Sequence, residues 1–264
     1  MLTDRAYLTG VQYRTHNHLA ARQSIYRYQH PRIDLAAAVL DLASLSGAET
    51  VADIGCGSGI YLAKLARRGH AGALLGADLS AGMLAAAAAA APTAQLIISD
   101  AAALPLAGAV TDITLAPHML YHVPDPLAAA AEFRRVTRAD GQVLVVLNGP
   151  GHLAELRDLV LATARANGEP LAGFEAQEHT YRAMTLDVAA PLLRDFFGSV
   201  TRHDFVAELV LTSAEPIAAY VASLHATQST PDPAGFTAAL AAALPFAADE
   251  TFRVTTHSGV LICR

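Results

Sequence analysis

The 264-residue sequence contains little cysteine, little lysine and little charge. Its two cysteines, Cys56 and Cys263, lie far apart, which argues against a disulfide framework or a zinc cluster and favours a reducing, cytoplasmic location. Lysine occurs once, and the formal net charge is −6. Because a polyanion attracts basic chains, this balance predicts no nucleic-acid partner.

Long uninterrupted apolar runs are also missing, although the mean hydropathy is +0.33. Alanine supplies 57 of the 264 residues, and it raises the mean without anchoring a chain in lipid. The most apolar stretch, residues 81–98, is interrupted by Gly82, Pro92, Thr93 and Gln95. The N-terminus has no basic segment followed by an apolar one. The sequence therefore predicts no transmembrane helix, no signal peptide and no membrane partner.

Between residues 31 and 150, short apolar runs alternate with segments of helical periodicity. Strands are expected at 50–56, 73–79, 94–99, 112–117 and 142–147, and helices at 31–45, 59–68, 81–91 and 124–138. Apolar strands separated by helices indicate a parallel sheet that is covered on both faces. Beyond residue 148 we expect helices at 152–166, 186–197, 214–224 and 236–244, a loop around Gly168, Pro170 and Gly173, and long strands at 200–211 and 251–263.

A glycine-rich turn, Asp53-Ile54-Gly55-Cys56-Gly57-Ser58-Gly59, follows the first expected strand. Glycines at a strand-to-helix turn permit positive φ angles and let a ligand approach the backbone. The third glycine comes one residue too early for the dinucleotide fingerprint, and no Gly-Lys-Ser/Thr follows as in a phosphate-binding Walker loop.

Two carboxylates end the next two expected strands. Asp78 is placed to accept hydrogen bonds from both hydroxyls of a ribose, and Asp100 from an exocyclic adenine amine. A single aspartate at a strand end is as readily a cap or a turn residue. Two of them downstream of a glycine loop predict a nucleoside site.

Together these segments resemble the class I S-adenosylmethionine-dependent methyltransferases, in particular the small-molecule group called methyltransferase type 11. Residues 53–59 resemble the first motif of the family, 76–84 the second, 99–105 the third and 112–136 the fourth. Asp140-Gly141 stands where the family usually has Pro-Gly.

The resemblance implies an α/β fold, a doubly wound, Rossmann-like sheet of seven strands in which the last strand is antiparallel. It divides the chain into an N-terminal helical lid (1–46), a cofactor-binding core (47–150), a helical cap insertion over the acceptor site (151–198), and the closing strands and helices of the sheet (199–264).

The resemblance also implies S-adenosyl-L-methionine as the cofactor. Leu115 and Ala116 would present backbone carbonyls to its α-amino group, and Leu79 would pack on its adenine. The full set of expected cofactor positions in the core is Asp53, Gly55, Cys56, Gly57, Gly59, Asp78, Leu79, Met83, Asp100, Ala101, Leu115 and Ala116. A sulfonium cofactor carries no phosphate, which agrees with the shortage of lysine.

The acceptor pocket is expected in the loops after the fourth and fifth strands, which hold His118, Tyr121, His122, Asn148 and His152. His118 and His152 are the candidates for a general base, because the ordinary pKa of imidazole, about 6.5, suits proton transfer. Alternatively, His118 fills a polar gap and His122 is structural. The eleven histidines show no metal-binding spacing, so no metal is expected.

Polar aromatic residues crowd the segment 26–32. Tyr26 and Tyr28 are predicted to contact the cofactor as part of the lid, and a neighbouring arginine to meet its carboxylate. A surface helix that carries amphipathic tyrosines is an equally simple interpretation.

The predicted function is methyl transfer from S-adenosylmethionine to an oxygen, nitrogen or carbon nucleophile of a small molecule, of the type found in secondary metabolism, by a monomer or homodimer. Two alternatives stay open: an enzyme that uses the bound cofactor for a non-methylating step such as a cyclisation, and a methyltransferase that acts on a protein or peptide.

Overall fold

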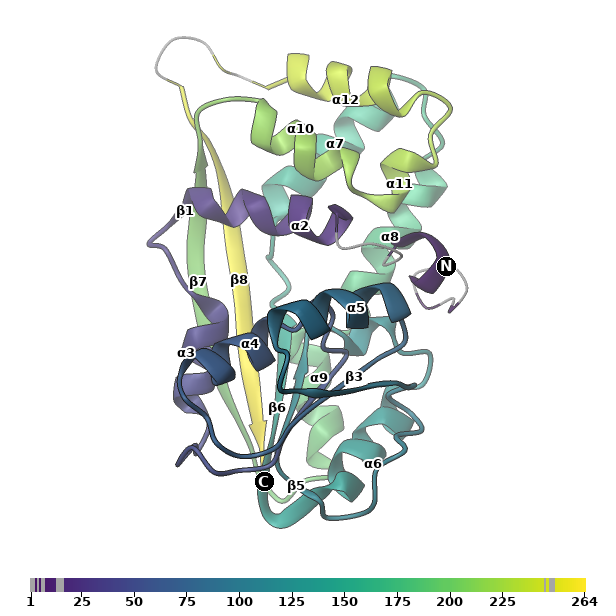
Figure 1. Cartoon of the computed structure of the whole chain (residues 1–264). Coiled ribbons are helices and arrows are strands. Elements are labelled where there is room, and N and C mark those ends of the chain that lie inside the picture. The colour runs from purple at the N-terminus through teal and green to yellow at the C-terminus, as the bar shows by residue number, and fades with distance from the viewer. Residues whose placement is uncertain (1–2, 4, 6–7, 13–16, 245, 247–249) are drawn as a thin grey trace.

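A central sheet lies between two layers of helices, and a cluster of helices forms a cap beyond one end of it (Figure 1). This computed structural model describes residues 3, 5, 8–12, 17–244, 246 and 250–264. The strands are β1 (Gln29–His30), β2 (Val51–Ile54), β3 (Leu74–Asp78), β4 (Gln95–Ile98), β5 (Thr111–Pro117), β6 (Thr137–Asn148), β7 (Val200–Leu211) and β8 (Phe252–Cys263).

The sheet has eight strands in the order β1-β7-β8-β6-β5-β2-β3-β4. Strands β4, β3, β2, β5 and β6 pair in parallel, and β8 lies antiparallel between β6 and β7. The expected arrangement with an antiparallel last strand is therefore confirmed. The strand number differs, because β1 adds a two-residue edge strand antiparallel to β7.

The longer helices are α2 (Asn17–Ser24), α3 (Leu35–Leu42), α4 (Ile60–Arg67), α5 (Ala81–Ala90), α6 (Pro126–Val136), α7 (Ala154–Ala166), α8 (Leu171–Arg182), α9 (Leu186–Arg194), α10 (Glu215–Ala222), α11 (His225–Gln228) and α12 (Pro233–Ala242). Short helical turns are η1 (Leu8–Gln12), η2 (Ile25–Tyr28) and η3 (Leu120–His122). Within the described ranges, none of these helices is long and apolar enough to cross a bilayer.

Side chains from the preceding loops fix where several helices begin. Asp34, Ser80 and Asp125 each accept a hydrogen bond from a backbone amide in the first turn of α3, α5 and α6. Helix α3 therefore starts at Leu35, and the expected start of this helix at residue 31 is wrong.

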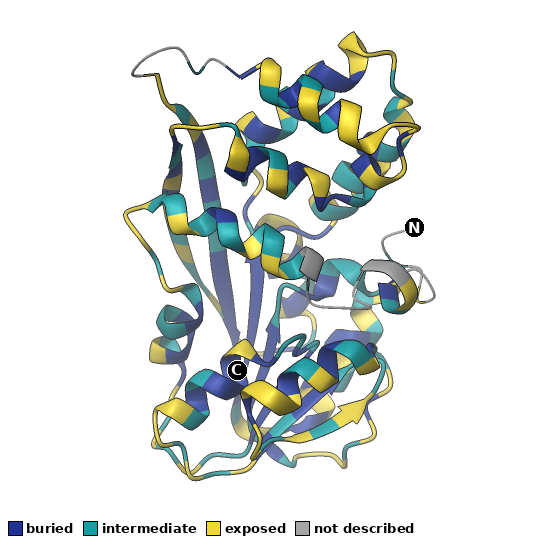
Figure 2. Cartoon of the chain, turned by 45° about the horizontal axis from the view of Figure 1, so that its top comes forward, coloured by how far each residue is buried: buried dark blue, intermediate teal, exposed yellow. Residues whose placement is uncertain are grey.

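Both faces of the sheet are buried. Val143, Val145 and Leu147 of β6 pack with α6 and α9, whereas Leu144 and Val146 pack with α3, α4 and α5. Successive residues of a strand point to opposite faces, so this alternation places one helical layer on each side. The strands at the centre of the sheet are accordingly buried along most of their length (Figure 2), which confirms the doubly wound α/β class.

The cap has its own apolar core, formed by α7, α8, α10 and α12 with the outer ends of β7 and β8. Phe174 of α8 packs against Phe236 of α12, with ring centroids 5.2 Å apart. Two expectations about this region need correction. Helix α8 occupies the segment expected to be a loop around Gly168, Pro170 and Gly173, and α9, expected in the cap, packs on the sheet.

Candidate active site

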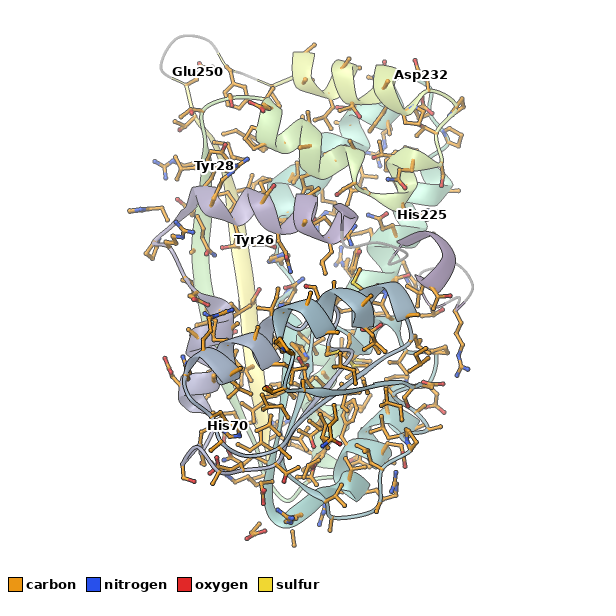
Figure 3. All side chains as sticks on the ribbon, in the orientation of Figure 1. Tyr26, Tyr28, His70, His225, Asp232 and Glu250 are labelled. Atoms are coloured by element: carbon orange, nitrogen blue, oxygen red, sulfur yellow. The ribbon has the colours of Figure 1, made fainter. Side chains whose placement is uncertain are left out.

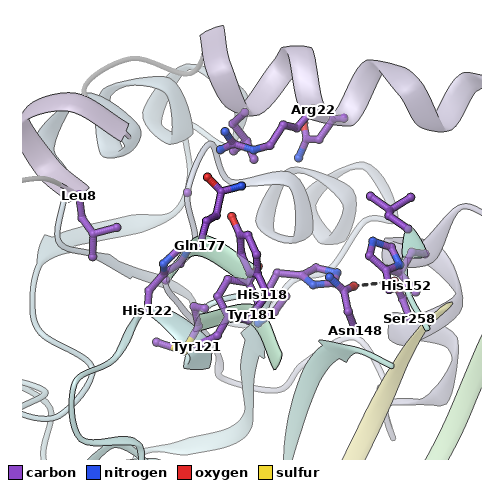
Figure 4. A pocket seen from close by; sticks show the side chains of 18 of the residues that line it. Leu8, Arg22, His118, Tyr121, His122, Asn148, His152, Gln177, Tyr181 and Ser258 are labelled. Atoms are coloured by element: carbon purple, nitrogen blue, oxygen red, sulfur yellow. Dashed lines mark hydrogen bonds between the residues drawn. The ribbon is translucent and has the colours of Figure 1, made fainter. Parts of the chain in front are cut away.

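A cavity of about 660 Å³ lies between the carboxyl edge of the parallel strands and the cap. Its walls come from the glycine loop, the ends of β3 to β6, the N-terminal segment and helices α7 and α8. Ligands of doubly wound sheets bind at this edge, outside the carboxyl ends of the strands. Figure 4 shows some of the side chains that line it, from Leu8 and Arg22 of the N-terminal region to His118 and His152.

The glycine loop exposes its backbone to the cavity. Gly55 and Gly57 have φ angles of +69° and +53°. A Cβ on Gly55 would lie 2.6 Å from the Cβ of Met119, whereas a Cβ on Gly57 would meet nothing closer than Leu19 Cδ2 at 3.9 Å. Gly55 thus permits close packing, and Gly57 keeps the loop open to a ligand. Cys56, which is buried, also lines the cavity.

Asp78, at the end of β3, is held by backbone amides. Its Oδ2 accepts from the Gly57 amide at 2.9 Å and its Oδ1 from the Ser80 amide at 2.8 Å. Burial raises the pKa of this carboxyl, and the amides oppose that effect. A carboxylate has about four acceptor sites, so Asp78 keeps capacity for a further donor from the cavity that it lines. Leu79 and Met83 continue the wall beside it.

Asp100 and Ala101 border the cavity at the end of β4. The Asp100 Oδ1 accepts from the Ala102 amide at 2.9 Å, and its other oxygen forms an ion pair with Arg5 of the N-terminal segment. Asp78 and Asp100 therefore stand at neighbouring strand ends of one cavity, as the sequence predicts for a nucleoside site.

Asp53 lies behind the glycine loop and does not border the cavity. It is fully buried, and neither carboxylate oxygen accepts a hydrogen bond from the described part of the chain. Burial, followed by the charge of Asp78, raises its pKa to about 8. Its expected contact with a cofactor stays a prediction. A positive charge in the cavity would stabilise the ionised form of this buried carboxyl.

His118 follows β5 with a φ angle of +53°, a conformation that non-glycine residues seldom adopt. Its backbone amide donates to Val146 O at 2.8 Å, and its partly buried ring has no hydrogen-bond partner among the described residues. Burial lowers the pKa of His118 to about 4, so the ring is neutral at pH 7. One ring nitrogen therefore carries a lone pair that can accept a proton.

His152 is engaged at both ring nitrogens. Its Nδ1 accepts from the His257 amide at 3.1 Å, and its Nε2 lies 3.0 Å from the Tyr26 hydroxyl. Burial, then His118 and His257, lower its pKa to about 3. A neutral ring whose Nδ1 accepts carries its hydrogen on Nε2, which donates to Tyr26. Of the two predicted bases, only His118 has a nitrogen available.

The other expected acceptor residues also line the cavity. Asn148 Oδ1 accepts from Ser258 Oγ at 3.0 Å (Figure 4). The Tyr121 ring meets His122 edge-on at 4.6 Å between centroids, and Tyr181 at 5.3 Å. No group of three or more metal-ligating side chains occurs among the residues that the structure describes.

Known proteins resemble this chain in sequence and in fold. Residues 52–145 match the family model described as a methyltransferase domain. Within this chain, residues 52–145 thus form a methyltransferase domain. An uncharacterized methyltransferase of Mycobacterium sp. (strain JLS) is 34% identical over 41% of this chain and 44% of that protein. A malonyl-[acyl-carrier protein] O-methyltransferase of Serratia marcescens is 32% identical over 47% of this chain and 48% of that protein.

The chain thus spans somewhat less than half the length of these curated relatives. In fold the match extends further. A putative methyltransferase from an antibiotic biosynthesis pathway of Anabaena variabilis superposes with a TM-score of 0.63 at 16% identity, covering 87% of this chain and 96% of that one.

Some residues expected to contact the cofactor lie elsewhere in the methyltransferase domain. Leu115 and Ala116 are enclosed within β5, and the cavity begins one residue later, at Pro117. Gly59, with φ +76°, lies outside the lining, and a Cβ there would come within 3.0 Å of Ala87. Its role is to let α4 approach α5.

The two tyrosines of the N-terminal region, Tyr26 and Tyr28, differ in their position relative to the cavity. Both rings pack against the apolar core of the cap, but only Tyr26 also lines the cavity. Tyr28 is covered by Arg27, whose guanidinium carbon lies 5.2 Å from the ring centroid. Figure 3 shows the two labels on opposite sides of the N-terminal helix. The structure therefore places Tyr28 outside the cavity in which its cofactor contact is expected.

The cap and the N-terminal helix α2 add lining residues that the sequence motifs do not mark. Tyr181, Gln177 and Phe174 come from α8, Tyr220 from α10 and Arg22 from α2. No local spacing marks these residues, because only tertiary packing brings their helices over the methyltransferase domain.

Proposed function

We propose that this chain transfers a methyl group from S-adenosylmethionine to a nucleophile of a small molecule. The observation that carries the proposal is one cavity that extends from the glycine loop, Asp78 and Asp100 to the helices of the cap. A concave cavity of about 660 Å³ in an acidic chain favours a small acceptor over a nucleic acid or a protein surface.

The residues present fit this cofactor. Asp78 offers lone pairs to the ribose hydroxyls, and Asp100 with the Ala101 backbone faces the adenine end. The open backbone at Gly57 suits the methionine end, and its positive charge would favour ionisation of the buried Asp53 carboxyl behind the loop. When bound, S-adenosylmethionine would supply a methyl group on a sulfonium leaving group, which an acceptor lone pair displaces while the carbon–sulfur electron pair stays on sulfur.

The chain's own contribution is orientation, exclusion of water and proton removal. Leu156, Val160 and Phe174 give the acceptor chamber apolar walls, which keep water from the reacting atoms. His118 can accept a hydrogen bond from a hydroxyl acceptor, because its neutral ring keeps a free lone pair. Its lowered pKa makes it a weak base, so it would take the proton only as the acceptor oxygen bonds to the methyl carbon and becomes acidic. Alignment of the nucleophile supplies the remaining acceleration.

Thermal denaturation with added ligands tests the proposal. S-adenosylmethionine and S-adenosylhomocysteine should raise the Tm, because they bind the native state alone, and NAD and ATP should not. Asp78→Ala should lose the shift, whereas Asp41→Ala, an exposed carboxylate outside the cavity, should keep it. A shift with NAD only would refute the proposed cofactor.

A chromatographic assay then separates methyl transfer from the non-methylating alternative. Methyl transfer produces one S-adenosylhomocysteine for each methylated acceptor. Turnover of an acceptor without S-adenosylhomocysteine would instead identify an enzyme that keeps its cofactor intact.

A further inference from the structure

Resting on the proposed function, we propose that the hydroxyl of Tyr26 holds the methyl acceptor, and that this acceptor is an aromatic molecule whose phenolic oxygen receives the hydrogen bond. His152 is then a positioning residue that orients Tyr26, in place of the base that the sequence suggests.

The direction of the hydrogen bonds supports this role. The His257 amide donates to His152 Nδ1 at 3.1 Å, so the ring hydrogen sits on Nε2 and points at the Tyr26 oxygen 3.0 Å away. The Tyr26 oxygen accepts in this contact, which leaves its own hydrogen to donate. None of the described residues accepts that hydrogen, and Tyr26 lines the cavity.

The support behind Tyr26 is rigid. The Tyr26 and His152 rings lie nearly parallel, at 20° with centroids 6.2 Å apart. The amide that fixes His152 belongs to β8, and the His257 ring in turn contacts Asp204 of β7, with 2.6 Å between Nε2 and Oδ1. Gly149 packs on that ring so closely that a Cβ would lie 2.1 Å from its Nδ1. A donor held in this way is pre-organised for a ligand.

Tyr26 remains a donor over the ordinary pH range, because burial raises the pKa of its hydroxyl far above the usual value. Tyr181 and Tyr220 are close enough to contribute to that rise. Three tyrosines from three elements, η2, α8 and α10, thus surround one region of the chamber.

The rest of the chamber favours a phenol. Phe174, Val160 and Leu156 provide apolar walls for a ring. Glu178 of α8 is paired with Arg157 of α7, with 3.1 Å between the guanidinium nitrogen and the carboxylate oxygen, so these two lining charges offset each other. A phenolic oxygen can accept from Tyr26 while its own hydrogen donates to the free nitrogen of His118, which takes the proton as the oxygen–methyl bond forms and the carbon–sulfur bond breaks.

The test uses 4-nitrophenol as the probe, because its phenolate has a visible absorbance band that reports both binding and ionisation. The probe is titrated into the full chain saturated with S-adenosylhomocysteine. Wild type should bind it and lower its apparent pKa. Tyr26→Phe should weaken binding about tenfold and return the probe's pKa toward its value in water, which is the effect of losing one hydrogen bond to a charged group.

His152 is tested by two variants. His152→Leu should reproduce the Tyr26→Phe loss, whereas His152→Gln, whose amide hydrogen can still donate to Tyr26, should restore most of the affinity and the pKa shift. Tyr28→Phe, next to Tyr26 but outside the cavity, is the matched control and should match wild type. The affinity for S-adenosylhomocysteine should stay the same in all four variants.

Three results would overturn the inference while leaving the proposed function intact. In the first, wild type fails to bind 4-nitrophenol. In the second, Tyr26→Phe weakens the binding of S-adenosylhomocysteine instead of the probe. In the third, Tyr26→Phe weakens 4-nitrobenzoate binding as much as 4-nitrophenol binding, which would point to a carboxylate acceptor. Failure of wild type to bind S-adenosylhomocysteine at all would overturn the proposed function itself.

Discussion

Alanine substitution at three glycines of similar backbone conformation should show which glycine is needed for helix packing and which for ligand binding. Gly57, Gly59 and Gly69 have φ angles of +53°, +76° and +77°. Alanine in this left-handed region costs about 1–2 kcal/mol, and the stiffer unfolded chain offsets about 0.4–1 kcal/mol of it. Each substitution should therefore lower the free energy of unfolding by about 1 kcal/mol from conformation alone.

The surroundings of the three glycines differ. A Cβ at position 69 would meet nothing within 4 Å, and one at position 57 only Leu19 at 3.9 Å. A Cβ at position 59 would lie 3.0 Å from both the Cα and the Cβ of Ala87, where backbone cannot easily yield. Overpacking typically costs about 1–3 kcal/mol, so Gly59→Ala should lose about 2–4 kcal/mol in total.

Urea denaturation at pH 7 measures the stabilities, and calorimetry with S-adenosylhomocysteine measures the affinities. Gly57→Ala should bind the ligand more weakly than wild type, because its methyl group enters the open side of the loop, whereas Gly69→Ala should bind normally. If Gly59→Ala cost no more stability than Gly69→Ala, the tight contact between α4 and α5 would be refuted. Unchanged affinity in Gly57→Ala would contradict the placement of the cofactor against the loop.

Three further outcomes are expected for the ligand-free chain or its complex. Burial and the charge of Asp78 raise the pKa of Asp53 to about 8. The free energy of unfolding should therefore fall as pH rises from about 4 to about 8, because the folded state holds the proton more tightly than the unfolded state. Asp53→Asn should flatten this fall, measured as the urea midpoint at each pH. Burial lowers the pKa of His118 to about 4, so the free energy of unfolding should fall as pH drops from about 6.5 toward 4. His118→Asn should reduce that fall, whereas His179→Gln, at an exposed histidine, should not. Equal pH slopes in the two variants would contradict the burial of His118. Tyr28→Phe should leave calorimetric affinity for S-adenosylhomocysteine unchanged, and a clear loss would return Tyr28 to the cofactor site.

The strands could be predicted from the sequence because both of their faces are covered by helices, which gives each strand a continuous run of apolar residues. Strand β7 has the predicted bounds, while β6 begins at Thr137, five residues before the predicted 142. Residues 138–140, Arg-Ala-Asp, are exposed, so no apolar pattern marks this part of the strand. Its inclusion depends on pairing between Thr111 and Thr137, which local sequence does not reveal.

Helix α8 shows why the cap was harder to predict. Pro170 and Gly173 suggest a loop, yet Pro170 occupies the N-cap position and Gly173 the first turn, where neither prevents a helix. The contact of Phe174 with Phe236, sixty-two positions later, supplies the tertiary packing that outweighs local propensity. Residues that reach the cavity only through such packing carry no motif.

Within the site, the sequence motifs predict which loops border the cavity, but the end of each strand determines which residues of those loops line it. Asp78 and Asp100 stand at strand ends, where side chains reach the cavity. Leu115 and Ala116 lie too far inside β5, so their immediate successors, Pro117 and His118, form the wall instead. The spacing of the motifs predicts the correct edge of the sheet, but it does not show at which residue each strand ends and the cavity wall begins.

The β7–β8 pair limits how ligands can enter and leave. Its twelve register pairs run without a break from Val200↔Cys263 in the sheet to Leu211↔Phe252 in the cap. Opening the cavity by a hinge between cap and sheet would require breaking this ladder of backbone hydrogen bonds. The N-terminal segment contributes Leu8 and Arg22 to the cavity wall and joins the sheet through the two residues of β1. We therefore expect a ligand to pass the described residues of this wall rather than a hinge between cap and sheet.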